Sequence, residues 1–566
     1  MGRAVAAAVG RPGAAARPRS GRHQWRFLLP EPGGGPDRPA LVLGGGPVDA
    51  EALLAMGAAT AVVDAVPGEP VLACLVGLAG SEADAVAALP AVREGGVALV
   101  EVDRRAPGGR RLTPGRLAAK ARAAGLEPAG TWLAAPDVHR PRRYVPLEGP
   151  EALRWYLGSL FVPSTARTAA VRVAGGVLAR AGLMGAVRWL APHYCMLLRR
   201  GGSGPPRPAA LGAVRAAGAG EPLRTLVLTS GQDAASRVVL LPFREGEREP
   251  VAVLKAATLP AGNRDTEAEL DRLLALREPL PRSIGAALPR PLGTGRLGEL
   301  AVTAQTAAQG QAMDRACGLL GAGRLRRDRD LRLAVAWATA FQRATTARRL
   351  VWDGAVADDL VVGPLRRLVA SYDPEGGDGL VHAAAAWSAA ADGTEVPLVA
   401  QHFDLAPCNL FLAGRRVTVL DWELSEARRA VGTGLPVDVL ALVTFWLFQA
   451  CGASSVDEEA ALVARLVGAP GRGRGPVATA GRAVHRWCRD LGLDPAMVPV
   501  LHAALWVERA HYQRARADAL GLGDDGPARH AATAFAFLGA LAGAGVSRPA
   551  RTPRAPSPTP GTAARR

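Results

Sequence analysis

Residues 398–423, LVAQHFDLAPCNLFLAGRRVTVLDWE, constrain the fold of this chain more than any other stretch. Their apolar runs predict buried strands on either side of a polar loop, followed by an acidic turn. The loop carries His402, Asp404 and Asn409 in the pattern H-x-D-x-x-x-x-N, and Asp421 ends the apolar run that follows. Phosphoryl transfer from ATP needs one carboxylate to orient the acceptor hydroxyl and take its proton, while an amide oxygen and a second carboxylate hold Mg²⁺. The spacing therefore predicts that these three groups meet at one point of the fold.

The run resembles the catalytic loop of the aminoglycoside phosphotransferase and choline kinase family, which shares the protein-kinase-like fold. That family commonly has H-G-D-x-x-x-x-N and then I-D-W, where this chain has HFDLAPCN and LDWE. The resemblance implies an α+β, two-lobed kinase-like domain in which Asp404 is the catalytic carboxylate, His402 supports the loop, and Asn409 and Asp421 hold Mg²⁺. Phe403 replaces the family's glycine and makes the loop bulkier. A catalytically inactive kinase-like scaffold or binding protein is therefore an alternative.

The same resemblance implies ATP and Mg²⁺ as cofactors and a small-molecule hydroxyl as the acceptor. A sugar, an aminocyclitol, an amino alcohol and a lipid-linked head group all fit, and the sequence leaves this choice open. Asp438, in a later P-x-D-like segment, is expected to steady the catalytic loop as a helix cap. The alternative for residues 398–423 is a pair of buried strands with polar residues placed by chance.

The kinase-like part is expected to begin near residue 222 with a strand, a turn and a second strand. The turn would lie over the ATP phosphates, and Gly231 is its one glycine. Lys255, in VAVLK, lies among apolar neighbours that bury its strand, and the resemblance implies that it reaches the α- and β-phosphates. In the acid-rich helix that follows, Glu269 lies four and seven residues before two leucines and shares their inward face. It is the predicted ion-pair partner of Lys255, with Glu267 as the alternative.

Residues 23–200 alternate apolar strand patterns with helical patterns, which predicts an α/β, Rossmann-like domain with a parallel sheet. The first strand runs into the glycines 44–46, and the second ends at Asp64. Such glycines let the backbone approach a nucleotide, and such an acid accepts hydrogen bonds from ribose hydroxyls.

This half resembles a class I S-adenosylmethionine-dependent methyltransferase, with Gly44 and Gly46 in the glycine loop and Asp64 as the ribose acid. Leu43, where an acid usually precedes the glycines, and Pro47 depart from the family pattern. The resemblance implies S-adenosylmethionine as a further ligand and a bifunctional methyltransferase–kinase as an alternative function. The other interpretation is a degenerate domain retained for packing or for binding a partner or ligand.

Two segments of this half have less regular patterns. Residues 81–92, SEADAVAALPAV, are expected to form a helix between two strands. Residues 140–200 mix arginines with long apolar stretches, for which a helical subdomain packed on the sheet is preferred over a membrane-docking surface. A non-enzymatic, membrane-docked assembly factor is the corresponding functional alternative.

The expected organisation follows from composition. A basic tail, expected to be disordered, covers residues 1–22, and the Rossmann-like domain with its helical extension covers 23–200. A linker that begins with GGSGPPRP covers 201–221, the kinase-like domain covers 222–544, and a second basic tail covers 545–566.

The charge and the cysteine content argue against several classes of protein and of binding site. The net charge is +17, but ten arginines lie in the two tails, so no specific nucleic-acid partner is expected. Six cysteines are scattered without a C-x-x-C pair, which disfavours a zinc site and a disulfide framework and fits a reducing cytoplasm. The longest apolar run, 437–450, is too short to span a bilayer, and arginines interrupt the N-terminal apolar patch, so neither a membrane span nor a secretory signal is expected. The oligomeric state stays open.

Overall fold

The computed structural model divides into two compact units, residues 1–315 with 411–424 and residues 316–410 with 425–566. The structure describes residues 22–30, 37–43, 51, 53–79, 84–106, 111–138, 141–158, 170, 173–175, 177–178, 181, 187–201, 208–214, 224–229, 237–317, 323–422, 433–468, 471, 473–520 and 523–543.

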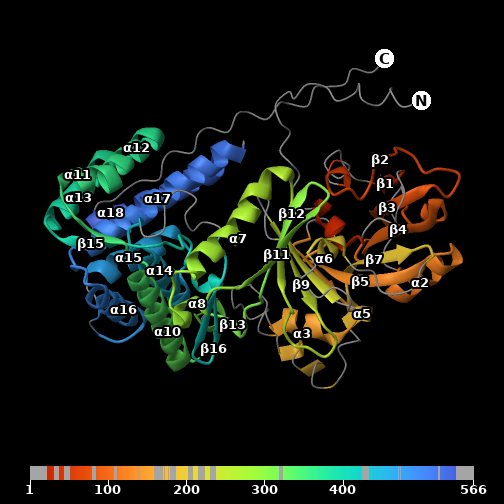
Figure 1. Cartoon of the computed structure of the whole chain (residues 1–566), viewed down its shortest axis with the longest axis horizontal. Helices are drawn as coiled ribbons and strands as arrows, with labels where there is room; N and C mark the ends of the chain where they lie inside the picture. The colour runs from red at the N-terminus through yellow and green to blue at the C-terminus, as the bar shows by residue number, and fades with distance from the viewer. Residues whose placement is uncertain are drawn as a thin grey trace, which may run out of the picture. The chain divides into compact units, whose positions relative to one another are not determined.

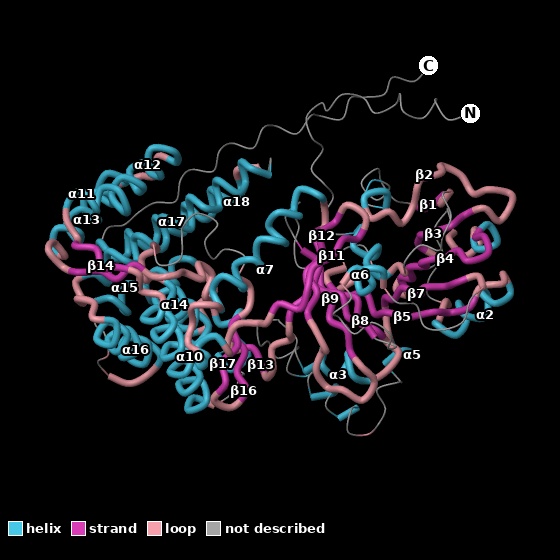
Figure 2. Tube along the Cα trace, in the orientation of Figure 1, coloured by secondary structure: helices cyan, strands magenta, loops and turns pink. Residues whose placement is uncertain are grey.

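The first unit is built on one twelve-stranded sheet, which Figures 1 and 2 show as a continuous run of strands. From one edge to the other the strands are β11 (Pro291–Leu297), β12 (Leu300–Gln305), β10 (Val253–Ala257), β9 (Arg237–Phe243), β8 (Arg224–Thr229), β6 (Arg143–Pro146), β5 (Glu127–Ala135), β7 (His193–Arg199), β4 (Val92–Asp103), β3 (Leu72–Leu78), β1 (Pro39–Leu43) and β2 (Ala61–Val62). The last four, β4, β3, β1 and β2, pair in parallel, and the other neighbours for which a register is recorded are antiparallel.

The expected parallel sheet is therefore correct for four strands and wrong for the rest of the N-terminal half. Strand β7, HYCMLLR, lies in the segment expected to be helical, and it is inserted antiparallel between β4 and β5. Its first six residues are all buried. A continuous apolar run of this kind has no periodicity that separates a buried strand from a buried helix. The Rossmann-like assignment of this half stays a prediction.

The helix expected over residues 81–92 is also wrong where the structure describes it. Residues 85–88 form a turn, and the 3₁₀ helix η2 (Leu89–Ala91) follows before β4 begins at Val92. Pro90 lacks a backbone N–H and is tolerated only in the first turn of a helix, so it limits this segment to a short connection.

The N-terminal half and the kinase-like strands share one hydrophobic core. Strand β6 pairs with β8 through Tyr144 and Val227, and the indole Nε1 of Trp132 donates to the carbonyl oxygen of Thr225 at 3.1 Å. Within the segment expected to be a linker, residues 209–213 form helix α6, whose first three residues are buried in the same core. The domain boundaries stay predictions, but one core contains residues from both sides of the expected linker and from α6 within it.

The other elements of the first unit lie around this sheet, and α7 packs on β10, β11 and β12 (Figure 1). They are η1 (Arg22–Leu28), α2 (Pro114–Ala123), α3 (Pro150–Gly158), α5 (Val187–Leu190), α6 (Ala209–Ala213), η4 (Pro260–Gly262), α7 (Asn263–Arg277), α8 (Arg282–Gly285) and a small sheet of β13 (Gln311–Ala312), β16 (Leu410–Ala413) and β17 (Arg416–Val419). Helix α9 (Asp314–Cys317) lies at the division between the units.

The second unit is mainly helical. It contains α10 (Arg324–Ala344), α11 (Gly354–Ala357), the π-helical turn η5 (Asp358–Val362), α12 (Gly363–Tyr372), α13 (Gly377–Ala390), η6 (Pro407–Asn409), α14 (Asp438–Cys451), α15 (Val456–Gly468), α16 (Pro476–Leu491), α17 (Met497–Leu520), α18 (Asp525–Ala542) and the strand pair β14 (Arg348–Val351) and β15 (Glu395–Leu398). Helix α14 is buried over most of its length, as the apolar run 437–450 predicts. A large mixed sheet together with many helices fits a kinase-like fold.

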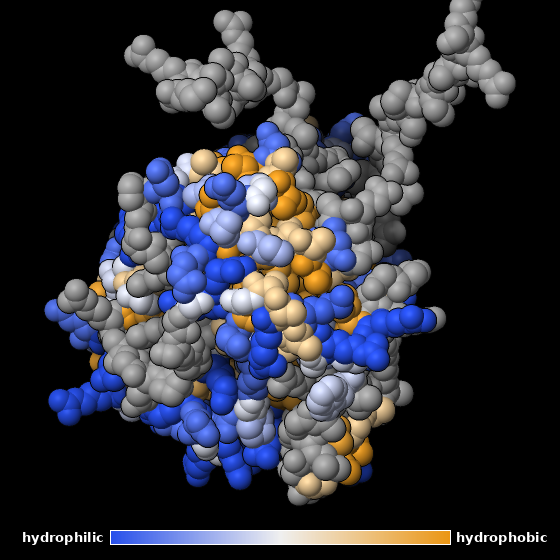
Figure 3. All heavy atoms as spheres, turned by 90° about the vertical axis from the view of Figure 1, so that its right-hand side faces the viewer, coloured by the Kyte–Doolittle hydropathy of each residue, from blue (hydrophilic) through white to orange (hydrophobic). Residues whose placement is uncertain are grey.

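The surface combines hydrophobic and hydrophilic groups, as one face of the molecule in Figure 3 shows. Within residues 140–200, the large hydrophobic side chains that lie exposed are Val173, Val177 and Trp189. Whether this segment docks on a membrane stays a prediction. In the described part of the chain, no helix has both the length and the apolar character needed to cross a bilayer.

Candidate active site

One group of candidate residues, in the first unit, contains a buried ion pair between strand β10 and helix α7. The Nζ atom of Lys255 lies 2.7 Å from Oε1 and 2.9 Å from Oε2 of Glu269, and Lys255 is 8% exposed. Strand β10 fixes the lysine because its neighbours on the strand are buried, and α7 turns Glu269 inward together with Leu273 and Leu276. The alternative partner, Glu267, pairs with Arg296 at 2.6 Å instead. The structure thus brings together the predicted pair Lys255 and Glu269.

Asp421 belongs to the same group and lies just beyond the end of strand β17. Its Oδ1 atom lies 2.8 Å from Nζ of Lys255, and its side chain is 39% exposed. The backbone of Asp421 adopts φ +67°, a left-handed conformation that non-glycine residues rarely take. The indole of Trp422 donates to the carbonyl of Val419 at 2.9 Å and closes the turn. The lysine therefore bridges a buried carboxylate and a partly exposed one.

Arg237 is a third charged group here, and sequence reasoning missed it. Its Nη1 atom lies 2.5 Å from Oε2 of Glu269, and the residue is 9% exposed at the start of β9. The one available signal was a charge at the edge of the apolar run RVVLLPF. Together with Asp421, this cluster contains two cations and two carboxylates, so its formal charges balance.

The other group of candidate residues lies in the loop of residues 402–409, in the second unit. Nδ2 of Asn409 donates to the backbone oxygen of Asp404 at 2.9 Å and to its Oδ2 atom at 3.1 Å. The backbone N–H of Asp404 donates to Nδ1 of His402 at 3.3 Å. The structure therefore brings His402, Asp404 and Asn409 together in one loop. Because the Nδ2 group of Asn409 is engaged, its amide oxygen is the atom that could contact a metal.

Asp438 holds the loop, as expected, but by a different contact from the predicted helix cap. Its carboxylate accepts from the backbone N–H groups of His402 at 2.6 Å and Phe403 at 2.9 Å, so it caps the loop and not its own helix α14. Burial raises the pKa of Asp438, and the electrostatic interactions with His402 and Arg509 and the two N–H donors act against that rise.

Phe403 has the backbone conformation that a glycine would take most easily. Its φ is +68°, in the left-handed region. Its ring contacts the ring of Tyr512, with centroids 5.9 Å apart, and its carbonyl accepts from Nη1 of Arg509 at 3.0 Å. The loop therefore keeps a turn that suits the family's glycine, although a bulky residue occupies the position.

Arg509, on α17, is the second functional candidate that sequence reasoning missed. Its Nη2 atom lies 3.0 Å from Oδ1 of Asp404, and its guanidinium lies over the ring of Phe445 at 5.3 Å. Since the sequence separation between Arg509 and Asp404 is 105 residues, no local pattern signals the contact.

The remaining predicted ligand residues are not brought to these groups by the described structure. Gly231, Gly44 and Gly46 lie outside the described residues. Asp64 is exposed just beyond β2. Among the described residues, no cluster of three or more His, Cys, Asp or Glu side chains could hold a metal ion. Amide and carboxylate oxygens such as those of Asn409 and Asp421 are ligands that Mg²⁺ accepts together with phosphate oxygens and water, so these residues fit that ion.

Comparisons with known proteins give one kind of match. No protein-family model matches the chain, and no curated protein matches it. Among solved structures, the chain is similar to a glucosamine kinase in complex with glucosamine, ADP and inorganic phosphate, with 16% identity, 57% of this chain and 94% of that chain covered, and a TM-score of 0.30. It is also similar to an aminoglycoside-3'-phosphotransferase of type VIII, with 22% identity, 49% and 98% covered, and a TM-score of 0.26. A choline/ethanolamine kinase family protein from Mesorhizobium loti matches with 16% identity, 57% and 89% covered, and a TM-score of 0.29. These structural neighbours are small-molecule phosphotransferases.

Proposed function

We propose that this protein is an ATP- and Mg²⁺-dependent phosphotransferase that acts on a hydroxyl group of a small molecule. Lys255 would contact the α- and β-phosphates, and Asn409 and Asp421 would hold Mg²⁺. Asp404 would orient the acceptor hydroxyl and take its proton, while the acceptor oxygen forms a bond to the γ-phosphorus and the bond to ADP breaks.

The observation that carries this proposal is the position of Lys255 between Glu269 and Asp421. A buried ion pair that serves only to stabilise the fold needs one carboxylate. A second carboxylate that is partly exposed is not required for that purpose. Asp421 lies in a left-handed turn, and its side chain is 39% exposed, so a metal ion could reach its carboxylate. Bound phosphates would replace Asp421 as the partner of the lysine, and the Asp421 carboxylate would then be able to hold Mg²⁺.

The catalytic loop supports the same function. The carboxylate of Asp404 has one oxygen bonded to Arg509 and the other to Asn409, which fixes its orientation before any substrate arrives. Phosphoryl transfer depends mainly on such positioning and on electrostatic stabilisation. The left-handed backbone of Phe403 is the conformation that a glycine would take there, so the bulky side chain has not changed the course of the loop.

The direct test is calorimetric titration of Mg-ATP into the wild type and into Asp421→Ala. We expect the wild type to bind and the variant to bind far more weakly, because it lacks one of two protein ligands for the metal. Asp378→Ala, which removes an exposed carboxylate from α13, is the matched control and should bind like the wild type. A wild type that does not bind Mg-ATP would sink the proposal.

One observation favours the second candidate, an S-adenosylmethionine site in the N-terminal half. Strand β1 lies between β2 and β3, and all three are parallel, so the chain leaves β1 in one direction and later returns on its other side. Ligands bind at such a switch point, beyond the carboxyl ends of the strands, and Asp64 follows β2 on that side. Titration of S-adenosylmethionine would test this: binding that is lost in Asp64→Ala and kept in Glu69→Ala supports the site, and no binding to the wild type removes it.

A further inference from the structure

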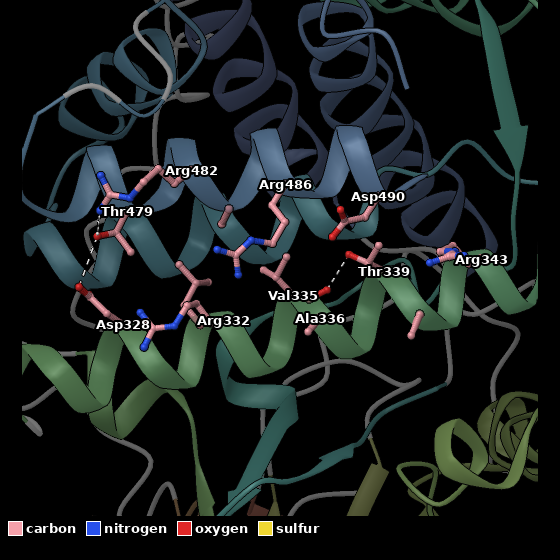
Figure 4. Close-up of a pocket in the computed structure, with 13 residues that line it drawn as sticks. Asp328, Arg332, Val335, Ala336, Thr339, Arg343, Thr479, Arg482, Arg486 and Asp490 are labelled. Carbon is pink, nitrogen blue, oxygen red and sulfur yellow. Dashed lines mark hydrogen bonds between the residues drawn. The ribbon is translucent and has the colours of Figure 1, made fainter. Parts of the chain in front are cut away.

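A groove lies between helices α10 and α16 of the second unit, and none of the residues that line it belongs to the proposed active site (Figure 4). Its volume is about 250 Å³. The two helices run side by side in the same direction, because Asp328 accepts from Thr479 near their N-termini and Gln342 accepts from Trp487 near their C-termini. Side chains from one stripe of each helix therefore line a single elongated hollow.

Four arginines border this hollow, two from each helix: Arg332, Arg343, Arg482 and Arg486. Figure 4 shows the guanidinium groups of Arg332 and Arg486 in the space between the helices. In the part of the chain that the structure describes, no carboxylate pairs with Arg332, Arg343 or Arg486. The lining thus has four arginines against two aspartates, Asp328 and Asp490.

The two acids that border the groove do not neutralise these arginines. Asp328 accepts from the hydroxyl of Thr479 at 3.4 Å, and Asp490 pairs with the adjacent Arg489 at 3.1 Å. Beyond Asp490 the groove continues into a second hollow of about 440 Å³, which Arg349 and Arg489 also line. Arg489 is paired with Asp490, and Arg349 lies 4.0 Å from Glu395, so the arginines of the first hollow carry the argument.

The floor of the groove is apolar and flat. It consists of small or branched side chains, among them Val335, Ala336, Ala340 and Ala483. Ala336 is exposed, so apolar surface there is open to solvent. If these arginines only contacted solvent on an outer helix face, no hollow with an apolar floor would be needed between the two helices.

We propose that this groove binds an organic phosphate, with the phosphate group held by the guanidinium groups of Arg332 and Arg486 and the organic part lying on the alanine floor. The planar guanidinium donates two parallel hydrogen bonds to a phosphate, which makes arginine the suitable residue for such a ligand. The apolar floor buries the organic part of the ligand. An organic phosphate should therefore bind more tightly than inorganic phosphate, which has no such part. The site does not depend on the proposed kinase activity.

The test uses phenyl phosphate as the probe, because it joins a phosphate to a small apolar ring. Calorimetric titration into the full chain should show binding, and inorganic phosphate should bind more weakly. Arg332→Gln with Arg486→Gln should weaken the binding of phenyl phosphate by at least about tenfold, because two charge-assisted contacts are lost. Both side chains are exposed, so the thermal unfolding temperature should not change.

Three further variants make the test specific. Arg529→Gln, an exposed arginine of α18 outside the groove, should bind phenyl phosphate like the wild type. Lys255→Ala should also bind it normally, because the proposed nucleotide site is separate. Ala336→Glu adds a carboxylate to the floor and should abolish binding. Absence of binding to the wild type, equal binding of inorganic phosphate, or a loss in Lys255→Ala with none in the double arginine variant would each overturn the proposal.

Discussion

Arg509 and Asp404 form an ion pair between helix α17 and the catalytic loop, with Nη2 of the arginine 3.0 Å from Oδ1 of the aspartate. The same guanidinium donates to the carbonyl of Phe403, also at 3.0 Å, and lies over the ring of Phe445. Because Asn409 donates to the other carboxylate oxygen, both oxygens of Asp404 are oriented by side chains. The helix thus fixes the direction in which the proposed catalytic group points.

Arg509 should act as a positioning residue. We expect Arg509→Gln to lower kcat by roughly tenfold or more, since a charge-assisted hydrogen bond contributes roughly 1.5–3 kcal/mol. KM for ATP should change little, because the described contacts of Arg509 lie in the loop and not at Lys255. Arg509→Lys, which keeps the charge without the two-pronged geometry, should recover part of kcat. Steady-state kinetics check this, and a raised KM for ATP with kcat unchanged would contradict it.

Glu269 should matter more for stability than Lys255, although the two form one ion pair. Glu269→Gln removes the buried carboxylate that Lys255 and Arg237 share and leaves Lys255 with the partly exposed Asp421, whereas Lys255→Met leaves Glu269 paired with Arg237. Removing one partner of a buried pair costs about 3–5 kcal/mol when the remaining charge is uncompensated. We therefore expect the larger fall in the free energy of unfolding for Glu269→Gln. Chemical denaturation of both variants measures it, and a larger loss in Lys255→Met would be inconsistent with the shared carboxylate.

Phe403 should tolerate glycine better than alanine, the reverse of the usual order. Both variants lose the ring contact with Tyr512, but only glycine removes the cost of the left-handed backbone, which is roughly 1–2 kcal/mol for other residues. Phe403→Gly should thus be more stable than Phe403→Ala by about 1 kcal/mol and should keep or raise any kinase activity. Thermal unfolding and an activity assay of the two variants decide the matter. A glycine variant that is the less stable of the two would show that the backbone conformation is different.

The predicted pairing of Lys255 with Glu269 shows what local patterns can supply. The buried strand around Lys255 indicated the lysine. The helical spacing relative to Leu273 and Leu276 indicated Glu269 as its partner. The loop of His402, Asp404 and Asn409 is also local, so its spacing was sufficient to identify it. The roles of all these residues stay predictions.

What the sequence did not supply depends on long-range contacts. Arg237 and Arg509 reach Glu269 and Asp404 from elements distant in the chain, and neither position has a pattern of its own. Strand β7 was missed because a fully buried strand lacks alternation. The glycine- and proline-rich composition near residue 201 suggested a linker, while the burial of α6 depends on core residues far away in sequence.

His502 should make the protein less stable in mild acid. It is fully buried on α17, neither ring nitrogen has a hydrogen-bond partner in the described structure, and burial lowers its pKa from 6.5 to about 4. Below pH 6.5 the unfolded chain takes up a proton that the folded chain refuses, so stability falls as the pH drops from 6.5 towards 4. The loss from this one group is roughly 3 kcal/mol, because one pKa unit corresponds to about 1.4 kcal/mol.

A matched pair of variants isolates this effect. His502→Leu removes the titrating group and an unsatisfied buried ring, so it should flatten the pH dependence of the free energy of unfolding and leave stability at pH 7 unchanged or higher. His485→Leu, which changes an exposed histidine of α16, should keep the pH dependence of the wild type. Denaturation curves between pH 4 and 8 provide the comparison, and an unchanged pH dependence in His502→Leu would refute the assignment.

The kinase-like part should not fold well when it is separated from the N-terminal half. Removing residues 1–221 would expose the edge of β8 that pairs with β6 and would uncover core side chains such as Val227, Leu240 and Leu254. It would also remove α6, which packs against β11. An exposed, apolar strand edge promotes association between chains. We expect residues 222–566 to elute as aggregates in size-exclusion chromatography and not to bind Mg-ATP, while a chain that lacks only residues 1–21 behaves like the wild type. If residues 222–566 instead formed a folded monomer that binds Mg-ATP, the shared core would be dispensable, and the linker expected from the sequence would be a true boundary between independent domains.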